Sequence, residues 1–364
     1  MPLPFIDDFH AIVTQRRPLI DTRAPVEFAK GSFPGAVNLP LMSDAEREKV
    51  GTTYKRKGHD AAVALGHELV GGAVKSERVE AWVDFVTKHP EAYLFCWRGG
   101  QRSQIAQEWL HEAGITIPRL QGGYKAFRAY LMAESLRLAK TKEILILGGR
   151  TGSGKTLLLP QLPESIDLEG LANHRGSSFG RYATPQPPQI GFESALSYAQ
   201  IQHDAAGHRR LILEDESRNV GHCYLPDEVF ATFQQGQVVL LEASLEERIE
   251  ITYDEYILAA QADYAHAHAE GKTPYDWVEV MRHNFARIRK RLGDENYRHL
   301  AERFEAAWTH QQRTGDPGEH RMWIRELLER YYDPMYDYQI ERKQDRIAFR
   351  GDAKSVLEYL KEEA

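Results

Sequence analysis

Residues 143–156 read EILILGGRTGSGKT, and this stretch decides the fold of the larger part of the chain. After Glu143, residues 144–147 form an apolar run that stops abruptly at glycines, as is typical of a buried strand. Gly149 to Thr156 then match the phosphate-loop pattern G-x-x-x-x-G-K-[ST] at every position. A strand before this loop and the run Leu157-Leu-Leu159 after it provide the context that the pattern requires. The stretch therefore predicts an α/β domain with a phosphate-binding loop.

The residue types in this loop suit a phosphate or a diphosphate. Glycines let backbone N–H groups close on phosphate oxygens, Lys155 supplies a point charge, and Thr156 can reach a magnesium ion. The motif by itself does not separate ATP from another diphosphate. We assign ligand binding to Gly149, Arg150, Thr151, Gly152, Ser153, Gly154, Lys155 and Thr156.

Two other segments are candidates for the same ligand. Asp215, or Glu214 beside it, follows the predicted strand Leu211-Ile-Leu213 and is expected near the metal, although acids at strand ends are often merely solvated. The glycine-bounded loop 167–180 either closes over the ligand or is only a connection. Its polar cluster consists of His174, Arg175, Ser177 and Ser178.

A second reactive segment is CWRGGQRS, residues 96–103. Cys96 ends the predicted buried strand 91–96, and a glycine loop and the helical pattern of residues 103–113 follow it. Inward-pointing N–H groups, Arg98 and Arg102 all favour the thiolate, which is the nucleophilic form. The alternative is that Cys96 is only a small buried apolar residue, which is the interpretation that we prefer for Cys223.

The rest of the chain suggests two domains, because 364 residues exceed what one core usually serves. A helical pattern over residues 124–140 separates two strand-and-helix regions, so we place the boundary near Lys140. The predicted domains are residues 1–140 and 141–364, both α/β. A charged helical insertion over about residues 246–338 precedes a last strand (346–350) and a last helix (354–361).

Composition limits the classes of function. The net charge of −7 does not predict nucleic-acid binding for the whole chain. One basic run, Arg282–Arg291, either engages a nucleic-acid backbone or is a solvated helix face. Two cysteines, no secretory signal and no membrane-length apolar run predict a cytoplasmic protein without a membrane partner.

The first domain resembles the rhodanese family. The resemblance rests on LIDTRAPVEF (19–28), Gly31, GAVNLP (35–40), the strand before Cys96 and LQGG (120–123), and it covers roughly residues 5–135. It implies that Cys96 carries a persulfide or a perselenide. One difference is the Cys-x5-Arg spacing from Cys96 to Arg102, which resembles the wider loop of rhodanese-fold phosphatases and suits a bulkier tetrahedral anion.

A rhodanese-like domain followed by a P-loop NTPase-like domain resembles the bacterial tRNA 2-selenouridine synthase family over the whole chain. The residues that carry this resemblance are 96–103, 148–156, 167–180 and 214–218. It implies a transferase that acts on the wobble 2-thiouridine of the tRNAs for lysine, glutamate and glutamine. The family geranylates the sulfur with geranyl diphosphate and then installs selenium from selenophosphate, which another enzyme supplies. We expect no tightly bound cofactor and assign no metal-ligating residue, although a magnesium ion could join the phosphate loop.

We expect Cys96 to take selenium as a perselenide while Arg98 and Arg102 bind the phosphate portion. Two other functions remain open. One is a Cys-x5-Arg phosphatase, or a sulfurtransferase, with a nucleotide-binding regulatory domain. The other is a nucleotide-gated binding module. Residues 96–103 contain no acid, which disfavours the phosphatase, and the presence of Cys96 disfavours an inert adaptor.

Overall fold

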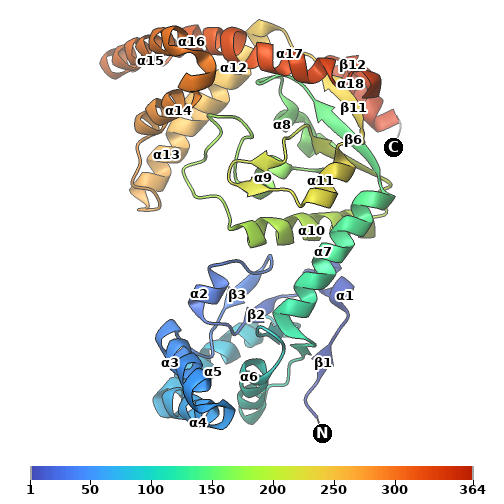
Figure 1. Cartoon of the computed structure of the whole chain (residues 1–364), viewed down its shortest axis with the longest axis vertical. Coiled ribbons are helices and arrows are strands. Elements are labelled where there is room, and N and C mark those ends of the chain that lie inside the picture. Colours follow the sequence, from blue (N-terminus) through green and yellow to red (C-terminus); the bar gives the residue numbers. More distant parts are fainter. Residues whose placement is uncertain (1, 363–364) are drawn as a thin grey trace. The chain divides into compact units, whose positions relative to one another are not determined.

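The computed structural model describes residues 2–362, which divide into two compact units. The first unit runs to Leu138 and includes Pro188–Gly207. The second comprises Ala139–Pro187 and the chain from His208 onward. Each unit contains a five-stranded parallel sheet with helices around it (Figure 1). The predicted α/β class is confirmed.

The sheet of the first unit has the strand order β1-β5-β4-β2-β3. Its strands are β1 (Phe5–Ile6), β2 (Leu19–Asp21), β3 (Ala36–Asn38), β4 (Tyr93–Phe95) and β5 (Arg119–Leu120). The strand predicted over residues 91–96 is confirmed as β4. Since β2 and β4 are parallel neighbours, with Asp21 opposite Phe95, the residues that follow them emerge at one edge of the sheet.

Helices surround this sheet. They are α1 (Phe9–Thr14), α2 (Pro25–Phe28), α3 (Asp44–Lys57), α4 (His59–Leu69), α5 (Gly72–Lys88), α6 (Gln101–Glu112) and α7 (Gly123–Thr141). The helices predicted over residues 103–113 and 124–140 are confirmed as α6 and α7. Helices α3 to α5 were not predicted from the sequence. Helix α3 has no fully buried residue and therefore shows little apolar periodicity, although Ser43 and Glu46 form a capping box at its start.

Helix α10 (Gln189–Ala205) also belongs to the first unit. Its Tyr198 and Ile201 pack in the same core as Phe127 and Leu131 of α7. The Oγ of Ser135 donates a hydrogen bond to Oε1 of Gln200 at 2.5 Å. The sequence of α10 did not reveal this grouping, because an apolar helix face suits either core.

The second unit is built on a sheet with the order β12-β11-β6-β8-β7, and all its pairings are parallel. Its strands are β6 (Glu143–Gly148), β7 (Ser165–Ile166), β8 (Arg210–Glu214), β11 (Gln237–Leu241) and β12 (Ile347–Gly351). A small antiparallel pair joins β9 (Asn219–Val220) to β10 (Cys223–Tyr224). Shorter helices are α8 (Lys155–Leu158), α9 (Leu168–Ala172) and α11 (Asp227–Phe233), and α18 (Ala353–Glu362) closes the described chain. Strand β6 lies in the middle of the sheet, so the phosphate loop follows its central strand.

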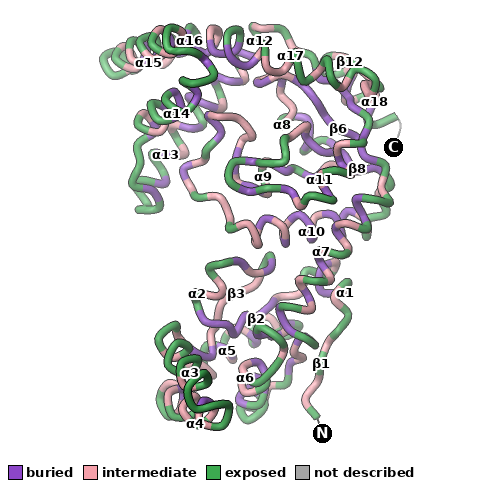
Figure 2. The backbone as a smooth tube through the Cα atoms, in the orientation of Figure 1, coloured by how far each residue is buried: buried purple, intermediate pink, exposed green. Residues whose placement is uncertain are grey.

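The charged region before β12 is helical, as predicted. It contains α12 (Leu245–Tyr253), α13 (Ala260–Ala269), α14 (Trp277–Leu292), α15 (Asp294–Thr314), α16 (His320–Leu327) and α17 (Asp333–Glu341). Their inner faces bury an aromatic cluster of Trp277, Phe285, Phe304 and Trp323. Figure 2 shows the alternation of buried and exposed positions along these helices. Among residues 2–362, no helix has both the length and the apolar character needed to cross a bilayer.

Candidate active sites

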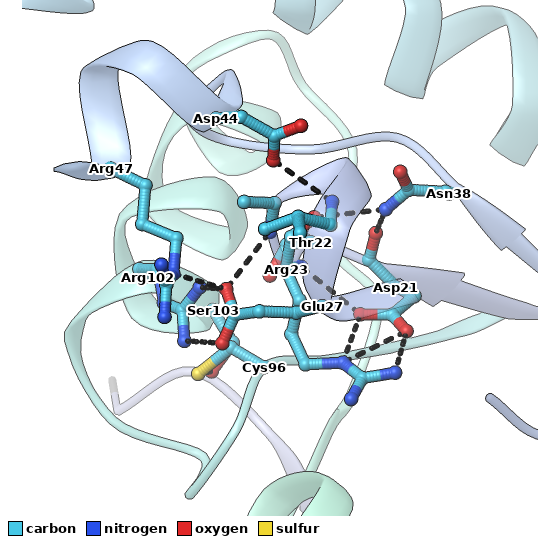
Figure 3. Close-up of polar contacts among 12 residues, drawn as sticks. Asp21, Thr22, Arg23, Glu27, Asn38, Asp44, Arg47, Cys96, Arg102 and Ser103 are labelled. Atoms are coloured by element: carbon cyan, nitrogen blue, oxygen red, sulfur yellow. Dashed lines mark hydrogen bonds and ion pairs between the residues drawn. The ribbon is translucent and has the colours of Figure 1, made fainter. Parts of the chain in front are cut away.

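Cys96 lies directly after β4, at the start of the loop that leads into α6. Only 3% of its surface is exposed. Its Sγ lies 3.1 Å from the Oγ of Ser103 and 3.7 Å from the carbonyl oxygen of Gly100. Figure 3 shows Cys96 and Ser103 beside Arg102 and Glu27. The hydroxyl of Ser103 is therefore placed to donate a hydrogen bond to a thiolate at Cys96.

Close backbone packing fixes the shape of this loop. A Cβ on Gly99, whose φ is +64°, would lie 2.8 Å from the carbonyl oxygen of Leu120. A Cβ on Gly123 would lie 2.2 Å from the nitrogen of Gly99. The N–H of Tyr124 donates to the carbonyl of Cys96 at 2.8 Å, which ties the loop to the turn before α7. Glycine at these two positions lets the backbones meet and holds Cys96 in place.

Arg102 is held by a carboxylate from another part of the chain. Its Nη1 and Nη2 donate to the two Glu27 oxygens at 2.6 and 3.2 Å, and Nε of Arg47 lies 3.1 Å from Glu27. Burial alone would raise the pKa of Glu27, but the hydrogen bond and charge of Arg102 more than offset it and lower the pKa. Glu27 is therefore ionised at neutral pH. Glu27 could not be identified as a partner of Arg102 from the sequence, because 75 positions separate the two residues.

The two arginines predicted at this site differ in environment. Arg102 is half-buried and paired, whereas Arg98 is exposed. Within the described residues no hydrogen bond or ion pair engages the Arg98 side chain. Arg98 can therefore turn toward a ligand without breaking a contact, whereas Arg102 must share its charge between Glu27 and an anion.

An exposed aromatic ring follows the cysteine. Trp97 is 42% exposed and stacks on Tyr124 with ring centroids 5.2 Å apart. The guanidinium of Arg23 lies 3.9 Å from the Tyr124 ring centroid and is ion-paired with Asp21 at 2.6 Å. This support leaves Trp97 with a surface on which a nucleobase can stack.

A cavity of about 130 Å³ adjoins the same loop. Apolar side chains of α3 and α4 and of the preceding segment provide most of its wall, including Leu41, Met42, Val50 and Val63. His59, His67, Gln101 and Arg102 add polar groups to the lining. A mostly apolar cavity of this size suits part of a hydrocarbon chain better than water.

The phosphate loop has the backbone shape that its glycines allow. Gly152 and Gly154 have φ of +77° and +88°. A Cβ on Gly152 would lie 2.5 Å from Oγ1 of Thr252 and 2.7 Å from the carbonyl oxygen of Arg248. The Nζ of Lys155 donates to the carbonyl of Gly149 at 2.9 Å. Because α8 is only four residues long, the loop amides rather than a helix dipole provide the anion site.

Other polar groups in the loop are engaged to different degrees. Arg150 is ion-paired with Asp337. The carbonyl of Thr151 accepts a 2.9 Å bond from Nε of Arg248. Ser153 is buried, and its Oγ has no hydrogen-bond partner within the described chain. A ligand oxygen would satisfy this hydroxyl. Thr156 is exposed.

Acids beside the loop keep Lys155 charged. Burial alone would lower the pKa of Lys155, but the acidic groups beside it hold that pKa above its usual value. These groups are Tyr336 and the pair Glu169–Glu216, which keeps one negative charge while one of its two carboxyl groups is protonated. Burial raises the pKa of Glu169, and the neighbouring charge of Glu216 raises it further. The carboxyl group of Glu169 therefore retains a proton near neutral pH. The sequence did not reveal Glu169 as a site residue.

Glu169→Gln tests this protonated carboxyl. A carboxyl group whose pKa is raised in the folded state stabilises the fold below its usual pKa of about 4.3, and this contribution is lost as pH rises. Glutamine is neutral at every pH. We therefore expect wild type to lose more unfolding free energy between pH 5 and pH 8 than Glu169→Gln does, by at least about 1.4 kcal/mol, the value of one pKa unit. Denaturant unfolding at both pH values measures this difference. The exposed Glu358→Gln is the control, and equal losses in wild type and Glu169→Gln would contradict the assignment.

The other residues that were predicted to bind the same ligand lie in different environments. Asp215 lies near the end of β6, but both its oxygens are paired with Nζ of Lys343 at 2.5 and 2.6 Å. Ser177 accepts a 2.6 Å bond from the Tyr256 hydroxyl, and the Arg175 guanidinium lies 3.9 Å from the Tyr182 ring centroid. The loop does pass close to the acids, since a Cβ on Gly176 would lie 2.2 Å from Oε1 of Glu169. His174 instead lines a different cavity, which is described below.

These features define a class of two-domain proteins in which a cysteine-bearing rhodanese-like unit is joined to a phosphate-loop unit. Residues 6–130 match the family model described as "Rhodanese-like domain". Residues 142–364 match the model described as "tRNA 2-selenouridine synthase AAA domain". The chain belongs to the tRNA 2-selenouridine synthase family.

Curated relatives with that name match over nearly their full lengths. The one from Sulfurovum sp. is 52% identical over 99% of this chain and 99% of its own. The one from Hydrogenovibrio crunogenus is 50% identical over 100% of both chains. The one from Pseudomonas putida (strain KT2440) is 49% identical over 99% of this chain and 98% of its own.

Proposed function

We propose that this tRNA-modifying enzyme converts wobble 2-thiouridine to 2-selenouridine in two transfers. The first transfer makes S-geranyl-2-thiouridine from geranyl diphosphate, and the second replaces the S-geranyl group with selenium from selenophosphate. The substrates would be the tRNAs for lysine, glutamate and glutamine. The main support is that one chain combines a buried cysteine in an arginine-containing loop with a phosphate loop that carries a charged lysine.

Geranyl transfer is assigned to the phosphate loop. The thiocarbonyl sulfur attacks C1 of geranyl diphosphate, so a carbon–sulfur bond forms while the carbon–oxygen bond to diphosphate breaks. The diphosphate leaves with the electron pair, and the uracil ring loses a proton. The loop amides, the Ser153 hydroxyl and Lys155 would stabilise the negative charge that develops on the leaving group.

Calorimetry tests this assignment directly. Titration of the full chain with geranyl diphosphate should give saturable binding that Lys155→Ala weakens. Tight binding of ATP without any response to geranyl diphosphate would refute the assignment and favour a nucleotide-binding role for the loop.

No step is assigned to a magnesium ion. Asp215 and Thr156 are the groups that would hold one, but Lys343 neutralises Asp215. The donor set therefore fits a metal poorly, and Lys155 is the charge available to a diphosphate.

Selenium transfer is assigned to Cys96. Its thiolate sulfur would form a bond to selenium as the selenium–phosphorus bond of selenophosphate breaks, with Arg98 and Arg102 on the phosphorus group. That group leaves as phosphite with the electron pair of the broken bond, so the reduction of phosphorus balances the oxidation that forms the sulfur–selenium bond. The bound selenium then attacks C2 of the geranylated uridine, and geranyl thiol leaves. A thiol reductant cleaves the sulfur–selenium bond and regenerates Cys96. Alkylation matters because an S-alkyl group leaves more readily than a thiocarbonyl sulfur.

The apolar cavity beside Arg102 is a suitable site for the geranyl chain during this second step. Val63→Trp would fill the cavity from α4. We expect it to slow selenation of geranylated tRNA at least about tenfold, which corresponds to about 1.4 kcal/mol of lost binding. Geranylation should stay at the wild-type rate. The control is Val37→Trp at an exposed position outside the cavity, and selenation of geranylated tRNA by Val63→Trp at the wild-type rate would refute this role.

A second candidate reaction has support from the loop itself. Cys96, Arg102 and Ser103 form a Cys-x5-Arg-Ser arrangement with Ser103 Oγ 3.1 Å from Sγ, which would also suit attack of the thiolate on phosphorus. That attack would release selenide and leave a phosphorylated cysteine. The identity of the atom bound to Cys96 separates the two reactions.

A further inference from the structure

A cavity of about 520 Å³ in the second unit is distinct from the phosphate loop. It lies among the segments that follow α9 and β9 and the helices α13 and α14. Three strong cations line it, namely Arg181, Lys272 and Arg287. None of the described residues that line it is an aspartate or a glutamate, although acids outnumber lysine and arginine 53 to 46 in the chain. Such a lining favours an anionic ligand.

Side-chain hydrogen bonds fix the wall of this cavity. The side-chain amide of Gln186 donates to the carbonyls of Ala172 and Val220 at 2.8 and 2.9 Å. Its oxygen accepts a 2.8 Å bond from the N–H of His222. The side-chain amide of Asn173 donates to Oγ1 of Thr184 at 2.9 Å. The cavity is therefore largely preformed, as is usual for ligand sites of about 300–1,000 Å³.

The positive charges in this cavity are not all neutralised. Lys272 is paired with Glu270 at 2.7 Å. Arg181 and Arg287 are exposed, and within the described chain neither has an ion pair. Elsewhere on α14, Arg282 is paired with Glu305 and Arg289 with Asp294, each at 2.7 Å. The basic run on this helix therefore presents Arg287, rather than these paired arginines, as a free charge.

A buried histidine reports the same positive field. His174 is 5% exposed, and its Nδ1 has no hydrogen-bond partner within the described residues. Its pKa is lowered to about 4, first by burial and then by the charges of Arg181 and Arg287. His174 is therefore neutral at physiological pH, and a ligand would satisfy its ring nitrogen.

Aromatic rings lie beside the cations. Tyr182, Tyr264 and Tyr275 line the cavity, and Tyr275 is 58% exposed. Arginines with an accessible aromatic face are the combination that binds the phosphate and base of a single-stranded nucleotide. A basic peptide would need acidic side chains in the lining, and a lipid would need a larger apolar surface than this cavity offers.

We propose that this cavity binds one nucleotide of the substrate tRNA, with its phosphate on Arg181 and Arg287 and its base against Tyr275. The inference rests on tRNA being the substrate, but not on the assignment of either transfer to its site. It makes the cavity a tRNA-positioning site in the phosphate-loop unit.

Binding of an unmodified tRNA transcript to the full chain, measured across a series of salt concentrations, tests the proposal. Tyr275→Ala should weaken binding roughly 5- to 150-fold, because stacking of a base on an aromatic ring is lost. Arg287→Ala should weaken binding and reduce the slope of log affinity against log salt by about one. Arg282→Ala is the matched control on the same helix and should change affinity less than about twofold. Melting temperatures of all three variants confirm that they fold.

Two results would overturn the proposal. One is wild-type affinity of both cavity variants for tRNA, or an equal loss in Arg282→Ala. The other is that the two cavity variants bind tRNA with wild-type affinity but no longer bind uridine 5′-monophosphate as the wild type does. That result would identify a site for free nucleotides. Since neither geranyl diphosphate nor selenophosphate is present, failure of the proposed transfers would leave these binding results unchanged.

Discussion

Cys96→Ala is expected to form geranylated tRNA at the wild-type rate and to form no 2-selenouridine. The proposed selenium carrier is a single sulfur atom, and alanine has no group that can bond to selenium. Loss of a catalytic nucleophile typically costs more than about 10³-fold in rate, so the product should fall to background. Nucleoside analysis of tRNA by mass spectrometry measures both products in one sample.

Two further variants control for effects on folding. Cys223→Ala makes the same change at the other buried cysteine, whose Sγ contacts the carbonyl of Pro187, and should leave 2-selenouridine formation intact. Cys96→Ser keeps a small polar side chain beside Ser103 but is a far weaker nucleophile, so it should resemble Cys96→Ala. Formation of 2-selenouridine by Cys96→Ala at the wild-type rate would remove Cys96 from the mechanism.

Lys155→Ala is expected to show the opposite defect. In the proposed reaction, this substitution would remove the cation that faces the leaving diphosphate, and loss of one such stabilising group typically costs about 10²–10³-fold. Geranylation should fall by that factor, and 2-selenouridine made from 2-thiouridine tRNA should fall with it. When geranylated tRNA is supplied, however, Lys155→Ala should make 2-selenouridine normally.

The matched control is Lys354→Ala, which removes an exposed lysine of α18 in the same unit and should not affect either reaction. Normal geranylation by Lys155→Ala would refute the role of the phosphate loop. Loss of selenation on geranylated tRNA would show that the two steps are not divided between the two sites.

The sequence predicted the elements around both reactive loops because their signals are local. An apolar run that stops at glycines identified β4 and β6, and the motif 149–156 requires a strand before it. Helices α3 to α5 were missed because α3 has no fully buried residue and so lacks a clear apolar stripe. A local pattern cannot report which core a helix such as α10 joins.

The partners of the site residues were less predictable for the same reason. Glu27 meets Arg102 only because β2 and β4 are neighbours in the sheet. Glu169 and Glu216 lie beside Lys155 through the packing of α9 and the end of β8, and the pairing of Asp215 with Lys343 spans 128 positions. Residue types and spacing therefore predicted a candidate nucleophile and the phosphate loop, whereas tertiary contacts determine how their charges are balanced.

Mass spectrometry of the Cys96 peptide after incubation of wild-type protein with selenophosphate is the most direct test of the selenium-carrier claim. The account predicts an adduct with the isotope pattern of one selenium atom, which a thiol reductant removes and which Cys96→Ala does not form. An unmodified cysteine, or one that carries phosphate in place of selenium, would contradict it.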